Sequence, residues 1–253
     1  MTDVSRNTVT KLLVDLGAAC SEYLNKALVN LPCQRVQCDE IWSFCYAKEK
    51  NVTAKIAATV PSAGDVWTWV AIDADTKLIC SWLVGKRDPI AARDFIEDLA
   101  GRLASRVQLT TDGLKLYLTA VEGSFGAEID FAQLVKVYGN DPEGQKRYSP
   151  AQCLACEPKA VTGTPDPKHI STSYIERQNL TMRMQMRRFT RLTNAFSKKI
   201  ENHVASIALH YMHYNFCRIH QTLRVTPAME VGISDHLWSI EEVISLLGPR
   251  HPV

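Results

Sequence analysis

The sequence contains no long apolar run. No stretch approaches the roughly 20 residues that a membrane-spanning helix requires. The N-terminal residues MTDVSRNTVTK also lack the apolar segment of a signal peptide. These absences exclude a membrane-spanning helix and predict a cytoplasmic protein with no membrane partner.

Also absent are a disulfide framework, internal repeats and a glycine-rich phosphate loop. The eight cysteines are scattered along the chain, which predicts reduced thiols in a cytosolic protein. Cys153 and Cys156 form a CLAC sequence with no second pair nearby. Because a structural zinc ion normally needs four ligands, two loop thiols are a simpler interpretation than a zinc site.

The net charge of +2 is small, but the charge is unevenly distributed. From Lys168 to Lys199 there are eight lysines and arginines against one acid, Glu176, so this segment carries +7. A local excess of this sign favours a polyanionic partner. A solvated helix face is the alternative interpretation.

The 253 residues, 46% of them apolar, suffice for one large domain or one domain with small appendages. Runs of β-branched and aromatic residues predict five strands, over 36–47, 65–76, 77–86, 106–113 and 129–138. Apolar spacing predicts helices over 2–17, 18–28, 89–103, 114–122, 171–191, 199–216 and 240–247. The Pro- and Gly-rich segment 140–168 is expected to be a surface loop. This order predicts an α/β fold with a mixed five-stranded sheet flanked by helices.

Three acids occupy special places in this order. Asp39 lies inside the first strand, Asp112 ends the fourth, and Glu176 lies on the helix after the fifth. A carboxylate within an apolar strand is costly unless it is paired or bound to a metal ion. If the first and fourth strands are neighbours, Asp39 and Asp112 face one another, and two like charges so close favour binding of a divalent cation. Because the ligands are oxygen atoms only, the expected ion is Mg²⁺ or Mn²⁺.

Other interpretations of these acids are open. Asp39 and Glu40 could form an exposed pair on an edge strand, Asp112 could be a turn residue, and Asp73 with Asp75 could be the metal ligands instead. On the helix predicted over 171–191, Glu176, Arg183 and Arg187 are expected to share one ridge. Such a ridge suits a metal-bound phosphate whose backbone continues past the metal.

At these residues the sequence resembles the DDE transposases of bacterial insertion sequences, and within them the insertion-sequence-one group. The matching pieces are QCDEIWSF, TTDGLKLY, STSYIERQNLTMRMQMRRFTRLTNAFSKK and YNFCRIHQTLRVTPAME, which together span about 36–232. The resemblance implies a ribonuclease-H-like (retroviral-integrase) fold and a catalytic, metal-binding triad of Asp39, Asp112 and Glu176. It also implies that Arg177, Asn179, Arg183 and His220 contact DNA or support the site. The basic segment adds Arg187, Arg188, Arg191, Lys198 and Lys199 as expected DNA contacts.

The resulting domain prediction has three parts. Residues 33–232 form the catalytic domain, with 140–168 as its loop insertion, and 233–253 form a helical tail. Residues 1–32 form a helical segment that resembles the second helix of a helix-turn-helix, with Arg6, Asn7 and Thr8 at its start; an ordinary amphipathic helix fits the pattern equally well. Family members carry a longer N-terminal region, which puts recognition of the element ends in question for this sequence.

These observations predict a transposase that cleaves and joins DNA with Mg²⁺ or Mn²⁺. Its expected partners are the terminal repeats of the element, target DNA and at least one further copy of itself, at the nucleoid of a bacterial cell. Two rivals remain: a catalytically idle remnant that binds DNA, and a metal-dependent nuclease that cuts without joining.

Overall fold

The computed structural model describes residues 4–139, 153–190 and 194–248. Its strands are β1 (Arg35–Cys45), β2 (Gly64–Asp73), β3 (Ile79–Gly85), β4 (Gln108–Asp112), β5 (Asp130–Tyr138) and β6 (Cys153–Thr162). Its helices are α1 (Arg6–Ala27), α2 (Ala54–Thr59), α3 (Pro89–Arg102), α4 (Leu116–Phe125), α5 (Ser173–Gln185), α6 (Ile200–Met212), α7 (Pro227–Glu230) and α8 (Ile240–Ser245). Short 3₁₀ turns lie at η1 (Glu49–Asn51), η2 (Pro167–His169) and η3 (Arg187–Phe189), and a π-helical turn, η4 (His213–Cys217), follows α6. In the part of the chain so described, no helix combines the length and apolarity needed to cross a bilayer.

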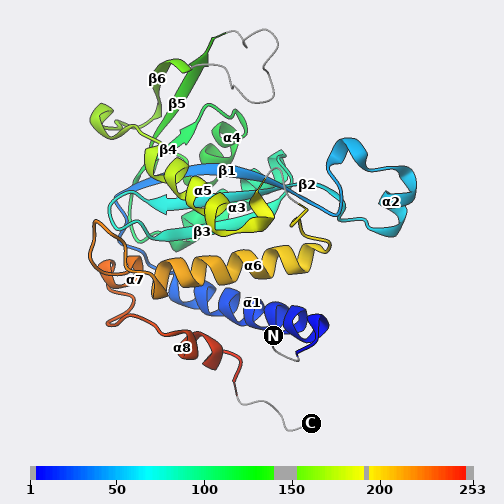
Figure 1. Cartoon of the computed structure of the whole chain (residues 1–253). Coiled ribbons are helices and arrows are strands. Elements are labelled where there is room, and N and C mark those ends of the chain that lie inside the picture. The colour runs from blue at the N-terminus through cyan, green and yellow to red at the C-terminus, as the bar shows by residue number, and fades with distance from the viewer. Residues whose placement is uncertain (1–3, 140–152, 191–193, 249–253) are drawn as a thin grey trace.

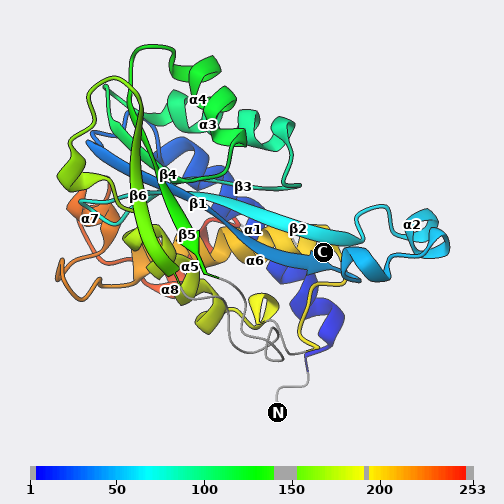
Figure 2. The same ribbon diagram turned by 90° about the horizontal axis from the view of Figure 1, so that it is seen from above.

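The sheet is mixed, with strand order β3-β2-β1-β4-β5-β6. β1 to β3 pair antiparallel in sequence order, with η1 and α2 between β1 and β2 and a short turn between β2 and β3, while β1, β4 and β5 run parallel. Helices α3 and α4 cover one face, and α5 and α6 cover the other, with α1 packed on the outer side of α6 (Figures 1 and 2). This arrangement confirms the predicted α/β class with a mixed sheet flanked by helices.

The sheet has a sixth strand that the sequence analysis placed in a loop. β6 pairs antiparallel with β5, from Cys153 opposite Tyr138 to Thr162 opposite Phe131. Nearly all of its side chains are exposed, so it carries no apolar alternation. Its backbone hydrogen bonds to β5 define it instead, and Pro158 is tolerated because edge strands leave one side of the ladder free. The prediction of an unbroken loop over 140–168 is therefore wrong for 153–162, while 140–152 fall outside the described residues.

The N-terminal segment forms one helix rather than two. The prediction ended a helix at Gly17, but α1 continues through this residue. A Cβ atom placed on Gly17 would lie 2.5 Å from the Cα atom of Ala205 on α6, so the glycine permits close packing of two helices. Leu16, Cys20 and Leu24 join the same core as the sheet residues. Docking on α6 thus stabilises this helix, and the Ser5 hydroxyl caps its N-terminus by accepting from the Thr8 amide.

The helix predicted over 171–191 also differs, because α5 ends at Gln185. The chain turns at Met186 into the 3₁₀ turn η3. This turn buries Phe189, whose ring centroid lies 5.2 Å from that of His203 on α6. Arg187 consequently leaves the ridge that Glu176 and Arg183 share.

His203 joins β1 to α6 through a directional hydrogen-bond network. The Ser43 hydroxyl donates to the Val66 carbonyl (3.0 Å) and lies 3.0 Å from Nε2 of His203. The Ser197 hydroxyl receives a bond from Arg188 and lies 2.8 Å from Nδ1. Every group is satisfied when His203 is neutral with its proton on Nε2. Burial, with a smaller effect of the Arg188 charge, lowers the pKa of His203 to about 4.

The close helix contact at Gly17 predicts that replacing two helical glycines by alanine has opposite effects on the free energy of unfolding. Gly17→Ala should lower the free energy of unfolding by about 1–3 kcal/mol, because α1 and α6 must move apart. The matched variant Gly123→Ala on α4, where an added Cβ meets nothing within 4 Å, should raise it by about 0.5–1 kcal/mol. Urea denaturation measures both, and equal effects of the same sign would contradict the packing argument.

The neutral state of His203 predicts a pH-dependent stability. In the unfolded chain this histidine titrates near 6.5 and in the folded chain near 4, so protonation below pH 6.5 favours unfolding. Comparison with His203→Gln isolates this effect from other titrating groups. Between pH 6.5 and pH 4 the stability of the wild type relative to the variant should fall by about 1.4 kcal/mol per pH unit. A difference that is independent of pH would mean that His203 is charged in the folded protein.

Candidate acidic active site

The strand order brings Asp39 and Asp112 together. β1 and β4 are parallel neighbours, with Cys38 opposite Thr111, so the residues that follow each of these lie side by side. β1 lies in the middle of the sheet, which makes the interpretation of Asp39 as an exposed edge-strand residue wrong. Asp112 also acts in a turn, because its Oδ1 accepts from the Leu114 amide at 3.0 Å.

The three carboxylates of the predicted triad line one cleft of about 540 Å³. Asp39 comes from β1, Asp112 from the end of β4, and Glu176 from the first turns of α5. Two cations, Arg87 and Lys136, line the same cleft. Residues more than 130 positions apart in the sequence thus share one solvent-accessible space.

Glu40 is a site residue that the sequence analysis did not select. One carboxylate oxygen each of Asp39, Glu40 and Asp112 lies within 4.8 Å of the others. Glu40 is nearly inaccessible, and it pairs with Arg87 at 2.5 Å and accepts from the Tyr117 hydroxyl at 3.1 Å. Two adjacent acids within an apolar strand were visible in the sequence, but only one was assigned a role.

Burial and neighbouring like charges raise the pKa of both acids of β1. Burial and the Asp112 charge raise the pKa of Asp39 to about 6. Burial, Asp112 and Asp39 together raise the pKa of Glu40 to about 7, against the opposing effect of Arg87. Burial first, and the neighbouring carboxylates second, therefore oppose the charged form of both acids.

Glu176 lies in the cleft but outside the tight cluster. Its Oε1 atom is 2.6 Å from the ammonium of Lys136 on β5 and accepts a hydrogen bond from the Thr172 hydroxyl. Lys136 is thus the cationic partner of Glu176 in the cleft. The structure accordingly separates a close pair, Asp39 and Asp112, from a third carboxylate with a cationic partner of its own.

The donor set fits a hard divalent cation. The close acids offer oxygen atoms, which Mg²⁺ and Mn²⁺ prefer, and a cation would relieve the charge crowding. Asn179 donates to Oδ2 of Asp39 at 2.9 Å and so fixes the orientation of that carboxylate. Its own Oδ1 is buried with no hydrogen-bond partner among the described residues, which leaves a further oxygen beside Asp39.

The alternative acids have other partners. The carboxylate of Asp73 accepts hydrogen bonds from Thr76 within the β2–β3 turn, and Asp75 pairs with Arg35. Among the residues that the structure describes, the one group of three potential metal ligands is that of Asp39, Glu40 and Asp112. The Sγ atoms of Cys153 and Cys156, exposed on β6, lie 3.8 Å apart.

The predicted DNA-contacting residues fall into distinct environments. Exposed positions are occupied by Arg177, Arg187, Lys198 and Lys199, and half-buried ones by Arg183 and His220. Arg188 points inward to Ser197, and burial lowers its pKa, so its contact is structural. Asn179 orients Asp39 and is buried, and Arg191 lies outside the described residues. Arg6, Asn7 and Thr8 at the start of α1 are exposed.

No family model and no curated protein matches the chain. Among solved structures, the chain is similar to one in the cryo-EM structure of the simian T-cell lymphotropic virus intasome in complex with PP2A regulatory subunit B56 gamma. The two share 14% identity with a TM-score of 0.43 over 83% of this chain and 58% of the other. It is also similar to a chain of the piggyBac transposase synaptic complex with hairpin DNA, with 10% identity and a TM-score of 0.39 over 90% and 54%. The chain thus spans little more than half the length of each, and likeness at this level establishes neither family nor activity.

The acidic cluster predicts stabilisation by divalent ions. At a Mn²⁺ concentration a hundred times its Kd, binding to the folded state should add about 2.7 kcal/mol of stability. For a chain of this size the melting temperature should then rise by about 5–10 °C in thermal denaturation. Asp112→Asn should remove most of the rise, and the control Asp15→Asn, at an exposed position on α1, should keep it. An undiminished rise in Asp112→Asn would place the ion elsewhere.

Proposed function

We propose that the protein is a transposase that cuts and joins DNA strands with the help of divalent metal ions. The observation that carries this proposal is the shared cleft of Asp39, Asp112 and Glu176. It is supported by the resemblance of the sequence around these residues to the DDE transposases of insertion sequences. The α/β fold with a mixed sheet, on which the three acids line one cleft, also supports it.

The reaction consists of two transfers at phosphorus. First, a water oxygen attacks the phosphodiester at the element end, the bond to the 3′ oxygen breaks, and a 3′ hydroxyl and a 5′ phosphate result. Second, that hydroxyl attacks a phosphodiester of target DNA and displaces the 3′ oxygen of the target strand. Divalent ions supply activation of the attacking oxygen and stabilisation of the leaving oxygen in such transfers.

The residues of the chain have separable tasks in this proposal. Asp39 and Asp112 would hold the metal ion, Asn179 fixes the orientation of Asp39, and Glu176 would complete the ligand set from α5. Lys136, which pairs with Glu176 at 2.6 Å, is placed to contact a phosphate that enters the cleft and to release Glu176 as it does so. The exposed cations Arg187 and Lys198 bind further phosphates without regard to base sequence.

The acidic triad predicts a separation of catalysis from binding. Asp39→Asn keeps the shape of the side chain but removes charge, so cleavage and joining should fall by more than about 100-fold, beyond the loss typical of outer-shell changes. DNA affinity should persist or increase, because a negative charge is lost near phosphate. The assay incubates labelled terminal-repeat DNA and a supercoiled plasmid with Mg²⁺ and scores nicked and joined products, with Asp15→Asn as control.

The same assay distinguishes the rival functions. Binding by the wild type without products would identify a DNA-binding remnant, and nicked products without joined ones would identify a nuclease. Full activity of Asp39→Asn would overturn the assignment of the triad.

A further inference from the structure

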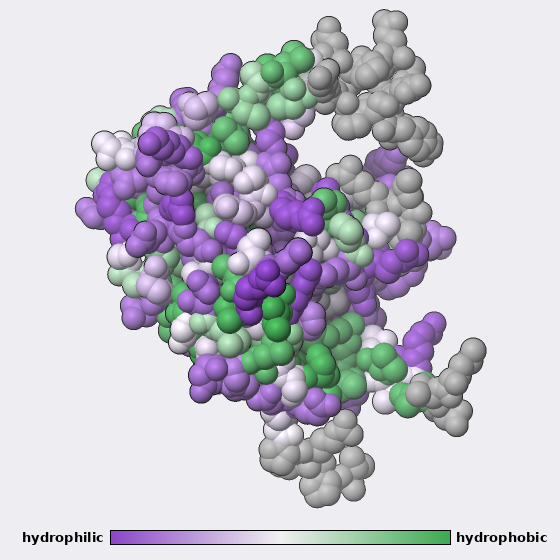
Figure 3. Space-filling model, turned by 60° about the vertical axis from the view of Figure 1, so that its left-hand side comes forward, coloured by the Kyte–Doolittle hydropathy of each residue, from purple (hydrophilic) through white to green (hydrophobic). Residues whose placement is uncertain are grey.

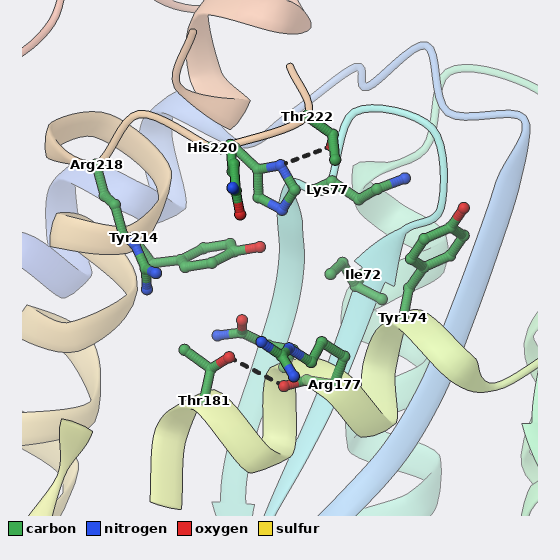
Figure 4. A pocket seen from close by; sticks show the side chains of 11 residues that line it. Ile72, Lys77, Tyr174, Arg177, Thr181, Tyr214, Arg218, His220 and Thr222 are labelled. Atoms are coloured by element: carbon green, nitrogen blue, oxygen red, sulfur yellow. Dashed lines mark hydrogen bonds between the residues drawn. The ribbon is translucent and has the colours of Figure 1, made fainter. Parts of the chain in front are cut away.

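A second pocket lies on the opposite side of α5 from the acidic cleft. It has a volume of about 290 Å³ and is enclosed by α5, by the β2–β3 turn, and by η4 with the loop that follows it (Figure 4). At 100° per residue, Tyr174, Arg177 and Thr181 lie about 160°, 100° and 140° around the helix from Glu176. One helix therefore presents an acid to one space and a basic, aromatic face to another.

The walls of this pocket are strongly cationic. Lys77, Arg177 and Arg218 line it, and its described lining contains no aspartate or glutamate. In the described part of the chain none of the three forms an ion pair. The Lys77 ammonium lies 3.6 Å from the centroid of the Tyr174 ring. Burial, together with the charges of Lys77 and Arg218, lowers the pKa of His220, which also lines the pocket.

Two buried donors in this wall lack hydrogen-bond partners. Nε2 of Gln178, a residue that is 3% exposed, and Nη1 of Arg218 have no acceptor among the described residues. An unsatisfied buried donor costs about 1–3 kcal/mol, so a ligand that supplies acceptor oxygens recovers stability here. The pocket is thus lined by three cations that form no ion pair in the described part of the chain and by two residues with unsatisfied donors. This lining suits an anion with several acceptor oxygens.

We propose that this pocket binds a phosphate group of a nucleic-acid strand, an inference that rests on the proposed function of the acidic cleft. The two spaces are separated by roughly 10 Å, the diameter of a helix with its side chains. Because each nucleotide of a strand carries one phosphate, a strand that enters the cleft has another phosphate within reach of the pocket a few nucleotides away.

The aromatic walls favour a nucleotide strand over a free inorganic anion. The rings of Tyr174 and Tyr214 lie on facing sides of the pocket (Figure 4), where they offer surfaces for a sugar or a base. On the face shown in Figure 3, hydrophilic residues predominate on the left, and apolar residues gather in the lower part and at the top.

The test measures binding in EDTA, where no strand is cut. Anisotropy of a labelled 20-nucleotide single strand is recorded over a salt series for wild type, Arg218→Gln and Arg177→Gln, with Lys11→Gln on α1 as the matched loss of one exposed charge. Each pocket variant should bind about tenfold more weakly, as expected for loss of a hydrogen bond to a charged group. Each should also lower the slope of log affinity against log salt by about 0.7. Lys11→Gln should leave both quantities close to those of the wild type.

The outcomes separate the pocket from the catalytic proposal. Wild-type affinity and slope in both pocket variants overturn the inference, even if the enzyme cuts DNA. If inorganic phosphate protects the wild type against heat through Arg218 while strand binding is unchanged in Arg218→Gln, the pocket binds a free anion and the strand assignment is wrong. Because Arg177 is exposed, Arg177→Gln keeps the test decisive should Arg218→Gln fail to fold. Weakened binding in the variants together with an inactive wild type supports the pocket and contradicts the transposase proposal.

Discussion

Repulsion between the carboxylates of Asp39, Glu40 and Asp112 is the constraint on which the cleft depends. Parallel pairing of β1 with β4 brings Asp39 and Asp112 side by side, because each directly follows a paired position, and Glu40 is the next residue of β1. The surroundings compensate in part, through Arg87 and Tyr117 at Glu40 and through Asn179 at Asp39. Three acids close together favour binding of a cation, so the same geometry that opposes ionisation of the buried acids gives the cleft a chemical use.

α5 connects this constraint to the rest of the molecule. Its buried residues Ile175 and Met182 anchor it on the sheet, and Gln37 of β1 accepts from the amides of Tyr174 and Ile175 at 2.9 and 3.2 Å. Hydrogen bonds from the backbone of α5 to the Gln37 side chain therefore set the position of Glu176 relative to the strand that carries Asp39. Residues on the opposite face of α5 line the cationic pocket. A shift of α5 would therefore change the shape of the acidic cleft and of the cationic pocket together.

Much of this arrangement could be predicted from the sequence, because strand and helix periodicity record which side chains are buried. The strand predicted over 65–76 and the helix predicted over 89–103 correspond to β2 and α3, and the places of Asp39 and Asp112 in the element order were predicted in the same way. β6 could not be found in this way, because its side chains are exposed and its strand form depends on pairing with β5. Gly17 was misread because a glycine at a helix end and one at a close helix contact look alike in sequence.

The cationic pocket was equally hidden, since Lys77, Arg177 and Arg218 are far apart in the chain and meet through tertiary packing. Glu40 needed the positions of Arg87 and Tyr117 before its role could be recognised. The periodicity of apolar residues predicts which face of a helix or strand a side chain occupies. It does not predict which side chain of another segment packs against that face. A site whose residues come from several turns and loops can therefore be recognised only when the fold is known.

The π-helical turn η4 covers backbone groups at one edge of the sheet, where a strand of another chain could otherwise pair. Asn215 is fully buried, and its side-chain amide donates to the carbonyl of Ile79 and accepts from its amide, both at 3.0 Å. It thereby occupies backbone groups at the free edge of β3, where another strand would otherwise add. At the other edge, Pro158 removes a donor from β6, and Glu157 and Lys159 flank it with charge. Both borders of a six-stranded sheet are thus protected against edge-to-edge aggregation.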